Sequence, residues 1–107
     1  MEANELRIGN YLLHDGYFVK SYSVDGFINI IKYINNYTPI PLTEEWLVKF
    51  GFEKLEGWDD MYYFQIGNFQ VYEYNVSGYD YDGFNIKHVH QLQNLYFALT
   101  NEELTIK

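Results

Sequence analysis

The chain has 107 residues, of which 48% are apolar, and it contains no cysteine. We therefore expect one domain with a single core, and the composition excludes disulfides, thiolate nucleophiles and cysteine zinc sites. Seven basic and fifteen acidic residues give a net charge of −8, which argues against direct binding to a nucleic-acid backbone. No apolar run is long enough for a membrane span, and the first ten residues do not resemble a signal peptide, so a cytoplasmic protein is expected.

Residues 10–33 are rich in β-branched and aromatic residues and contain two Asp-Gly pairs. Asp-Gly suits tight hairpin turns, because both central residues of such a turn adopt positive φ. With turns at Asp15-Gly16 and Asp25-Gly26, the pattern predicts a three-stranded antiparallel β meander over 10–33. Pro39 and Pro41 then predict an extended segment that leads out of the meander.

A short helix is predicted over residues 44–50. Thr43 is a typical N-cap residue, and two glutamates in the first turn suit the positive end of the helix dipole. Gly51 follows where a helix commonly ends in the left-handed conformation. The apolar face of this helix is expected to be buried, and it consists of Trp46, Leu47 and Phe50.

From residue 52 to residue 88 the apolar period changes to two, which predicts a second antiparallel sheet. Gly67-Asn68 has the length of a two-residue turn between two of its strands. Residues 77–83 are predicted to form an exposed loop. The expected strands cover residues 52–56, 61–66, 69–76 and 84–89.

Helical spacing returns over residues 89–99, and Asn101 suits a left-handed stop. A short last strand can follow at 103–106. The predicted fold is thus a single α+β domain over 1–107, with a small antiparallel β meander, a short helix, a second antiparallel sheet and a C-terminal helix. The apolar face of the C-terminal helix is expected to be buried and contains Val89, Leu92, Leu95, Tyr96 and Leu99, whereas Gln91, Gln93 and Asn94 fall off that face.

Three blocks of the sequence resemble blocks in short uncharacterised proteins of Bacteroidota and of their phages and prophages. They are NELRIGNYLL at 4–13, PIPLTEEWLVKFGFEK at 39–54 and VHQLQNLYFALTNEELTIK at 89–107. The resemblance covers both ends of the chain and one internal segment, but not the tyrosine-rich middle. It implies a small accessory protein of phage or mobile-element origin, which would act by binding a component of the host. It supplies no catalytic residue.

The middle of the chain is both acidic and aromatic. Between Lys54 and Lys87 there is no Lys or Arg, whereas six carboxylates and ten aromatic side chains, including Trp58, fall in this stretch. Tyrosine is enriched at protein interfaces because it supplies a large contact area at low entropic cost. The alternative is an ordinary half-buried hairpin. If the stretch is a contact surface, the predicted partner-binding residues are Tyr72, Tyr74, Tyr79, Asp80, Tyr81 and Asp82.

Metal binding has weak support in the sequence. His88 and His90 would face the same side of a strand but about 200° apart at the start of a helix, and they lie where strand gives way to helix. Asp80, Asp82 and Gly83 match part of a calcium loop, but its position 12 would be Val89, so an EF-hand is excluded. A looser site that also uses Asp59-Asp60 is left open. We predict that no metal and no other cofactor is required.

No common catalytic motif is present, and no nucleophile–base pair is recognisable, so we predict that the protein is not an enzyme. The preferred hypothesis is non-catalytic binding that inhibits a host protein, such as a basic nucleic-acid-binding or defence protein. One alternative is a sponge that sequesters a small nucleotide signal of host immunity, and another is a minor structural or assembly protein of a virion. A homo-oligomer is also left open, and neither a membrane nor direct nucleic-acid contact is expected.

Overall fold

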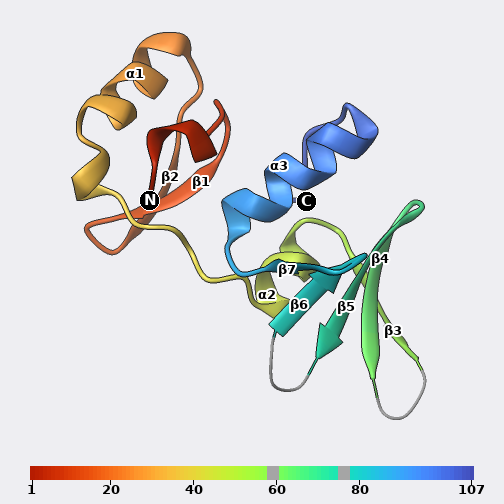
Figure 1. Cartoon of the computed structure of the whole chain (residues 1–107). Coiled ribbons are helices and arrows are strands. Elements are labelled where there is room, and N and C mark those ends of the chain that lie inside the picture. Colours follow the sequence, from red (N-terminus) through yellow and green to blue (C-terminus); the bar gives the residue numbers. More distant parts are fainter. Residues whose placement is uncertain (58–60, 75–77) are drawn as a thin grey trace.

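The computed structural model describes residues 1–57, 61–74 and 78–107, although not the side chain of Tyr74. It confirms the α+β class, with a two-stranded hairpin, a five-stranded antiparallel sheet and three α-helices in these residues. The hairpin and the first helix lie at one end of the molecule and the larger sheet at the other (Figure 1). In chain order the elements are 3-10 helix Ala3–Glu5, β1 Tyr11–His14, β2 Tyr17–Lys20, α1 Val24–Lys32, 3-10 helix Ile34–Asn36, α2 Glu44–Lys49, β3 Glu53–Glu56, β4 Tyr62–Ile66, β5 Phe69–Tyr74, β6 Gly78–Tyr81, β7 Phe84–Ile86 and α3 Val89–Thr100.

The predicted meander over 10–33 is wrong in its last third. β1 and β2 form the expected hairpin, and both residues of its Asp15-Gly16 turn have positive φ, at 50° and 81°. The third element, however, is the helix α1. Ser23 caps it by accepting a hydrogen bond from the Gly26 backbone nitrogen at 3.1 Å, so the second Asp-Gly pair lies in the first helical turn and makes no hairpin.

The apolar residues of α1 pack at helical spacing against the hairpin. Ile30 is buried with Leu6 and Leu12, and Phe27 and Ile31 are partly buried against the same cluster. These contacts form a small core that is separate from the main one. Spacings of three and four residues along α1 therefore decided its conformation, although β-branched residues such as isoleucine favour strands.

The segment between α1 and α2 is extended, as the two prolines predicted. Thr38 pairs with Leu13 of β1, and Pro41 pairs with His88 just before α3. Helix α2 matches the predicted boundaries closely. The Thr43 hydroxyl accepts a hydrogen bond from the Trp46 backbone nitrogen at 3.4 Å, and Gly51 has a φ of 96°.

The five-stranded sheet runs in the order β3-β4-β5-β6-β7 with every neighbouring pair antiparallel. Gly67-Asn68 makes the predicted two-residue turn, which pairs Ile66 with Phe69. The predicted loop at 77–83 is wrong, because residues 78–81 form β6 and the chain reverses over Asp82-Gly83. Both turn residues have positive φ, at 47° and 90°, as a tight hairpin turn requires.

The main core lies between one face of this sheet, α2 and α3. It contains the predicted Trp46, Leu47 and Phe50 of α2 and the predicted Val89, Leu92 and Tyr96 of α3, together with Phe64, Phe69, Val71, Tyr79 and Ile86 of the sheet. Leu95 is partly buried against this core. Leu99 was predicted to be buried, but it is 53% exposed because it lies in the last turn of α3, where less of the fold covers the helix.

The N-terminal segment is bound to α3 through buried amides. The Gln93 side chain is fully buried, and it accepts a hydrogen bond from the Tyr11 backbone nitrogen at 2.8 Å and donates one to the Gly9 carbonyl at 2.9 Å. The Asn94 side chain accepts hydrogen bonds from Arg7 and Asn10. Two of the blocks that carry the resemblance, 4–13 and 89–107, therefore contact each other in the fold.

The segment that follows α3 also packs on the main core. Asn101 has a φ of 60°, so it makes the left-handed stop that was predicted. The short last strand that could follow at 103–106 does not form, and Leu104 of this segment is buried in the core. The backbone nitrogen of Lys107 donates to the Lys49 carbonyl at 2.8 Å, which joins the end of the described chain to α2.

Candidate functional site

The five-stranded sheet has one face that the helices do not cover. Side chains alternate between its two faces, and the inner face packs on α2 and α3. Tyr72 on the opposite side is 37% exposed. We call this side the outer face, and by strand register it consists of Glu53, Leu55, Tyr63, Gln65, Gln70, Tyr72, Asp80 and Asn85.

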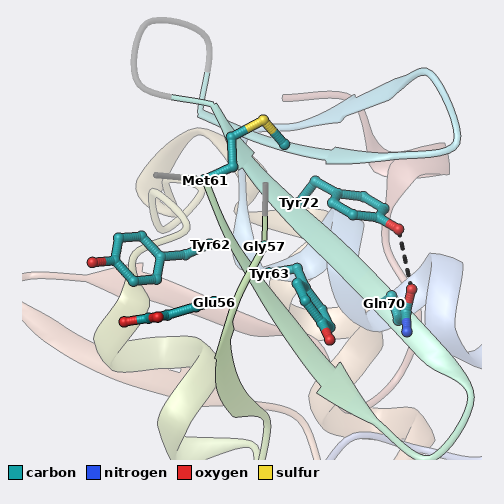
Figure 2. A pocket seen from close by; sticks show the side chains of 7 residues that line it. All are labelled: Glu56, Gly57, Met61, Tyr62, Tyr63, Gln70 and Tyr72. Carbon is teal, nitrogen blue, oxygen red and sulfur yellow. Dashed lines mark hydrogen bonds between the residues drawn. The ribbon is translucent and has the colours of Figure 1, made fainter. Parts of the chain in front are cut away.

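The outer face is hollowed where β3, β4 and β5 run side by side (Figure 2). The hollow has a volume of about 540 Å³, which falls in the size range of ligand-binding pockets. Figure 2 shows Tyr63, Tyr72 and Gln70 pointing to one side of the strands, whereas Glu56 and Tyr62 point to the other. The residues that line the hollow are Glu56, Gly57, Met61, Tyr62, Tyr63, Gln70 and Tyr72.

A directed chain of hydrogen bonds crosses the outer face. The Tyr72 hydroxyl donates to the Gln70 side-chain oxygen at 3.1 Å, and the Gln70 amide nitrogen donates to the Gln65 side-chain oxygen at 3.2 Å. Gln65 in turn donates to the Gly67 carbonyl at 2.8 Å. Because the Tyr72 hydroxyl donates its proton to Gln70, its oxygen keeps lone pairs that can accept a hydrogen bond from a bound partner.

The two tyrosine rings of the outer face are neighbours. Tyr63 and Tyr72 are directly opposed on β4 and β5, and their ring centroids lie 6.0 Å apart at an angle of 40°. Gly57 lies beside this pair, since a side chain at that position would meet the Tyr63 ring at 3.5 Å and the Met61 carbonyl at 3.2 Å. The absence of a side chain at Gly57 therefore keeps the hollow open.

The predicted partner-binding residues divide between the two faces. Tyr72 and Asp80 are paired across β5 and β6 and share the outer face. Asp80 also accepts a hydrogen bond from the Gly83 backbone nitrogen at 3.0 Å, which stabilises the turn after β6. Tyr74 is the last residue of β5, and its side chain lies outside the part of the chain that the structure describes.

Two of the predicted contact residues point into the core instead. Tyr79 is only 9% exposed and its ring lies edge-on to Phe64 with centroids 6.0 Å apart. Tyr81 is half-buried and stacks on Phe69 at 4.7 Å. The prediction that both tyrosines are exposed is wrong, because β6 continues through them and turns alternate side chains inward. Asp82 is exposed in the turn.

On the core side of the sheet, β5 also carries a partly buried carboxylate. Glu73 is paired with Tyr79, and one Glu73 oxygen is buried with no hydrogen-bond partner among the described residues. Burial raises the pKa of Tyr79, and the carboxylates of Glu73 and Glu44 raise it further. Lys54 is the last basic residue before the stretch that lacks Lys and Arg. Its Nζ lies 2.6 Å from a Glu44 carboxylate oxygen, and this hydrogen bond raises the pKa of the lysine.

Tyr63, Gln65 and Gln70 were not predicted from the sequence as part of this surface. The predicted Gly67-Asn68 turn could have identified them, because a two-residue turn fixes the register of β4 against β5. That register places Tyr63 opposite Tyr72. Asp59 and Asp60, for which a looser calcium site was left open, lie outside the described residues, as does Trp58.

No protein-family model, curated protein or solved structure matches the chain. Among the described helices, none is long and apolar enough to cross a membrane.

The two histidines near α3 form a second polar site. His88 is the N-cap of α3 and His90 is in its first turn, and their rings are stacked with centroids 5.8 Å apart. His90 is 1% exposed, and its Nε2 lies 3.5 Å from a Glu5 carboxylate oxygen, a distance too long for a strong hydrogen bond. Within the described residues, no group of three or more His, Asp or Glu side chains is placed to hold a metal ion.

The burial of His90 predicts a loss of stability in mild acid. Burial lowers the pKa of His90 below its usual 6.5, and the nearby Glu5 carboxylate only partly opposes this shift. The unfolded chain therefore takes up a proton near pH 6.5 that the folded chain does not. We expect the melting temperature to fall as the pH is lowered from 7 to about 5, and thermal melts across this range measure it.

His90→Gln removes the titrating group and is expected to flatten this pH dependence. His14→Gln is the matched control, and it should retain the full dependence because His90 is still present. The carboxylate of Glu5, whose pKa is lowered chiefly by its hydrogen bond from the Glu2 backbone, adds a further loss only below its usual 4.5. Equal slopes for the wild type and His90→Gln would show that His90 does not control the acid response.

Proposed function

We propose that the protein acts by non-catalytic binding and that its outer face contacts a basic surface of a host protein. The observation that supports this most directly is the open hollow between Tyr63, Tyr72 and Gln70. Aromatic residues at the centre of an exposed surface are typical anchors of protein interfaces.

The chemistry of the outer face favours a cationic partner. Residues 55–86 contain no Lys or Arg, and Asp80 adds a carboxylate beside Tyr72. Arginine stacks on tyrosine rings and donates several hydrogen bonds, and the Tyr72 oxygen is free to accept one. The net charge of −8 would also speed the encounter with a basic partner.

A phage-type accessory protein that inhibits a host defence protein would use such a surface. Many defence proteins act on nucleic acids and carry basic surfaces for phosphate. A surface of carboxylates and tyrosines can bind such a basic patch and block the access of nucleic acid, with no chemical step. The proposed activity is therefore inhibition by occupancy, inside the host cell.

The nucleotide-sponge alternative is less well supported at this site. A base could stack on Tyr63 or Tyr72, but a nucleotide also needs cations for its phosphates. The residues that line the hollow include neither Lys nor Arg. We therefore keep the protein-binding function as the proposal, while a role in virion assembly has no observation in its favour.

The proposed function predicts that the double variant Tyr63→Ser/Tyr72→Ser loses partner binding but still folds. The wild type and the variant are immobilised, exposed to a host lysate, and the retained proteins are identified by mass spectrometry. A protein retained by the wild type is then purified and titrated. We expect the double variant to bind it at least about 10-fold more weakly, which corresponds to about 1.4 kcal/mol.

The matched control is Tyr17→Ser/Tyr22→Ser, which removes two tyrosines that are 74% and 86% exposed elsewhere on the molecule. This control should bind like the wild type, and binding by the wild type should weaken as salt is raised. The proposal is wrong if the control loses binding and the outer-face variant does not. Thermal melting of all three proteins separates lost contacts from lost folding.

A further inference from the structure

Helix α1 has an exposed apolar side that the small core does not use. Val24 is 62% exposed and Ile28 is 57% exposed. They are four residues apart, so they are neighbours on the helix surface. The adjoining side of the helix packs against the hairpin through Phe27 and Ile30.

Two opposite charges frame this apolar side. Asp25 is in the first turn of α1 and Lys32 is in its last turn, and both are exposed. They are seven residues apart, which is nearly two full turns, so they lie on almost the same side of the helix as Ile28. Ile28 lies between them along the axis. In the described residues, neither charge is in an ion pair with another side chain.

The charge of the whole chain is strongly polarised relative to α1. Residues 8–43 are neutral, because Asp15 and Asp25 are balanced by Lys20 and Lys32. Residues 1–7, whose Leu6 belongs to the same small core as Ile30, carry a net charge of −1, so seven of the eight net negative charges lie in residues 44–107. The molecule is elongated, with extents of 45 × 27 × 23 Å, and Figure 1 shows α1 at the end away from the large sheet. Two copies can therefore approach through α1 without bringing their acidic sheets together, since charges are screened beyond about 8 Å at physiological salt.

We propose that two copies of the chain associate through α1 in an antiparallel two-fold contact. With the two-fold axis close to Ile28, Asp25 of one copy lies opposite the partner's Lys32, and the symmetric pair forms at the same time. The two Ile28 side chains meet at the centre, flanked by Val24 of each copy. The antiparallel arrangement also places the opposite ends of the two helix dipoles side by side.

The contact area of one nine-residue helix is small, so the association is expected to be weak and concentration-dependent. This inference does not depend on the proposed function, because the outer face remains open in the pair. It predicts that the mass measured by sedimentation velocity rises toward twice that of one chain as the protein concentration is increased.

Charge reversal provides a sharp test. Asp25→Lys gives a helix that carries two positive charges, and Lys32→Asp gives one that carries two negative charges. Each variant alone is expected to stay monomeric, because like charges then oppose each other across the two-fold axis. An equimolar mixture of the two variants should form a heterodimer, since each positive residue then faces a negative one. The double variant Asp25→Lys/Lys32→Asp should recover self-association.

Ile28→Asp keeps both original charges and removes the central apolar contact, so it is expected to be monomeric. Circular dichroism and thermal melting confirm that each variant is folded, and Ile28→Asp decides the question if a reversal variant does not fold. A wild type that is monomeric at every concentration overturns the proposal. It is also overturned if a wild-type dimer forms and neither Ile28→Asp nor the charge reversals weaken it.

Discussion

Replacing Leu92 with alanine is expected to lower the free energy of unfolding by about 2 to 5 kcal/mol. Leu92 is fully buried in α3 within the main core, where it belongs to the same cluster as Phe50 and Phe64. Truncation removes three buried carbon atoms and leaves a cavity, because packed neighbours relax only partly. Urea unfolding followed by circular dichroism measures the change.

Leu99→Ala is the matched control on the same helix. Leu99 is seven residues after Leu92 and has the same apolar side chain, but it is 53% exposed. The same truncation is therefore expected to cost less than about 1 kcal/mol. Equal losses for the two variants would contradict the described position of α3 on the core.

Gln93→Leu is expected to lower the free energy of unfolding by about 2 to 5 kcal/mol, although leucine has nearly the size of glutamine. The Gln93 amide is fully buried and satisfies two backbone groups, the Tyr11 N–H and the Gly9 carbonyl. Leucine would leave both of these part-buried groups without their side-chain partner. Each buried group left unpaired costs about 1 to 3 kcal/mol.

The control for this variant is Gln65→Leu. Gln65 bonds the carbonyl of Gly67, which is exposed and can accept a hydrogen bond from water instead. Its replacement should change stability by less than about 1 kcal/mol. A small loss for Gln93→Leu would mean that water or a rearranged backbone satisfies the two groups, and the link between the N-terminal segment and α3 would then be weaker than described.

The sequence predicted the elements whose local signals agree with each other. Thr43 with Gly51 bounded α2, and Gly67-Asn68 fixed the turn between β4 and β5. The error over α1 arose because its isoleucines and its Asp-Gly pair also suit a strand and a turn. Ser23 as an N-cap was the signal for the helix, and the small core formed with the hairpin stabilises it.

The candidate site was only half predictable. Tyr72 and Asp80 were both predicted as contact residues and are paired on neighbouring strands, but the Asp82-Gly83 turn was interpreted as part of a longer loop. If Asp82-Gly83 had been interpreted as a tight hairpin turn, as Asp15-Gly16 was, the sequence would have predicted strand β6 before it and a buried Tyr79. The hollow beside Gly57 could not be predicted, because it depends on how three strands lie together in space.

The buried polar residues of α3 could not be predicted from one helical face. The sheet and α2 cover the side of Leu92, while the N-terminal segment and β1 cover the side of Gln93. Helix α3 therefore buries an apolar side against the sheet and α2, and a polar side against the N-terminal segment. The polar side is tolerated because backbone groups of the N-terminal segment satisfy it.

The link between Tyr11 and Gln93 has a consequence for the order in which the protein matures during synthesis. The two residues are 82 positions apart, which takes on the order of 4 to 16 s at typical translation rates of about 5 to 20 residues per second. During that interval the hairpin and α1 can form from local contacts, but the Tyr11 N–H has only water as a partner. The nascent chain therefore completes its N-terminal segment only after α3 has left the ribosome, and native stability is acquired late.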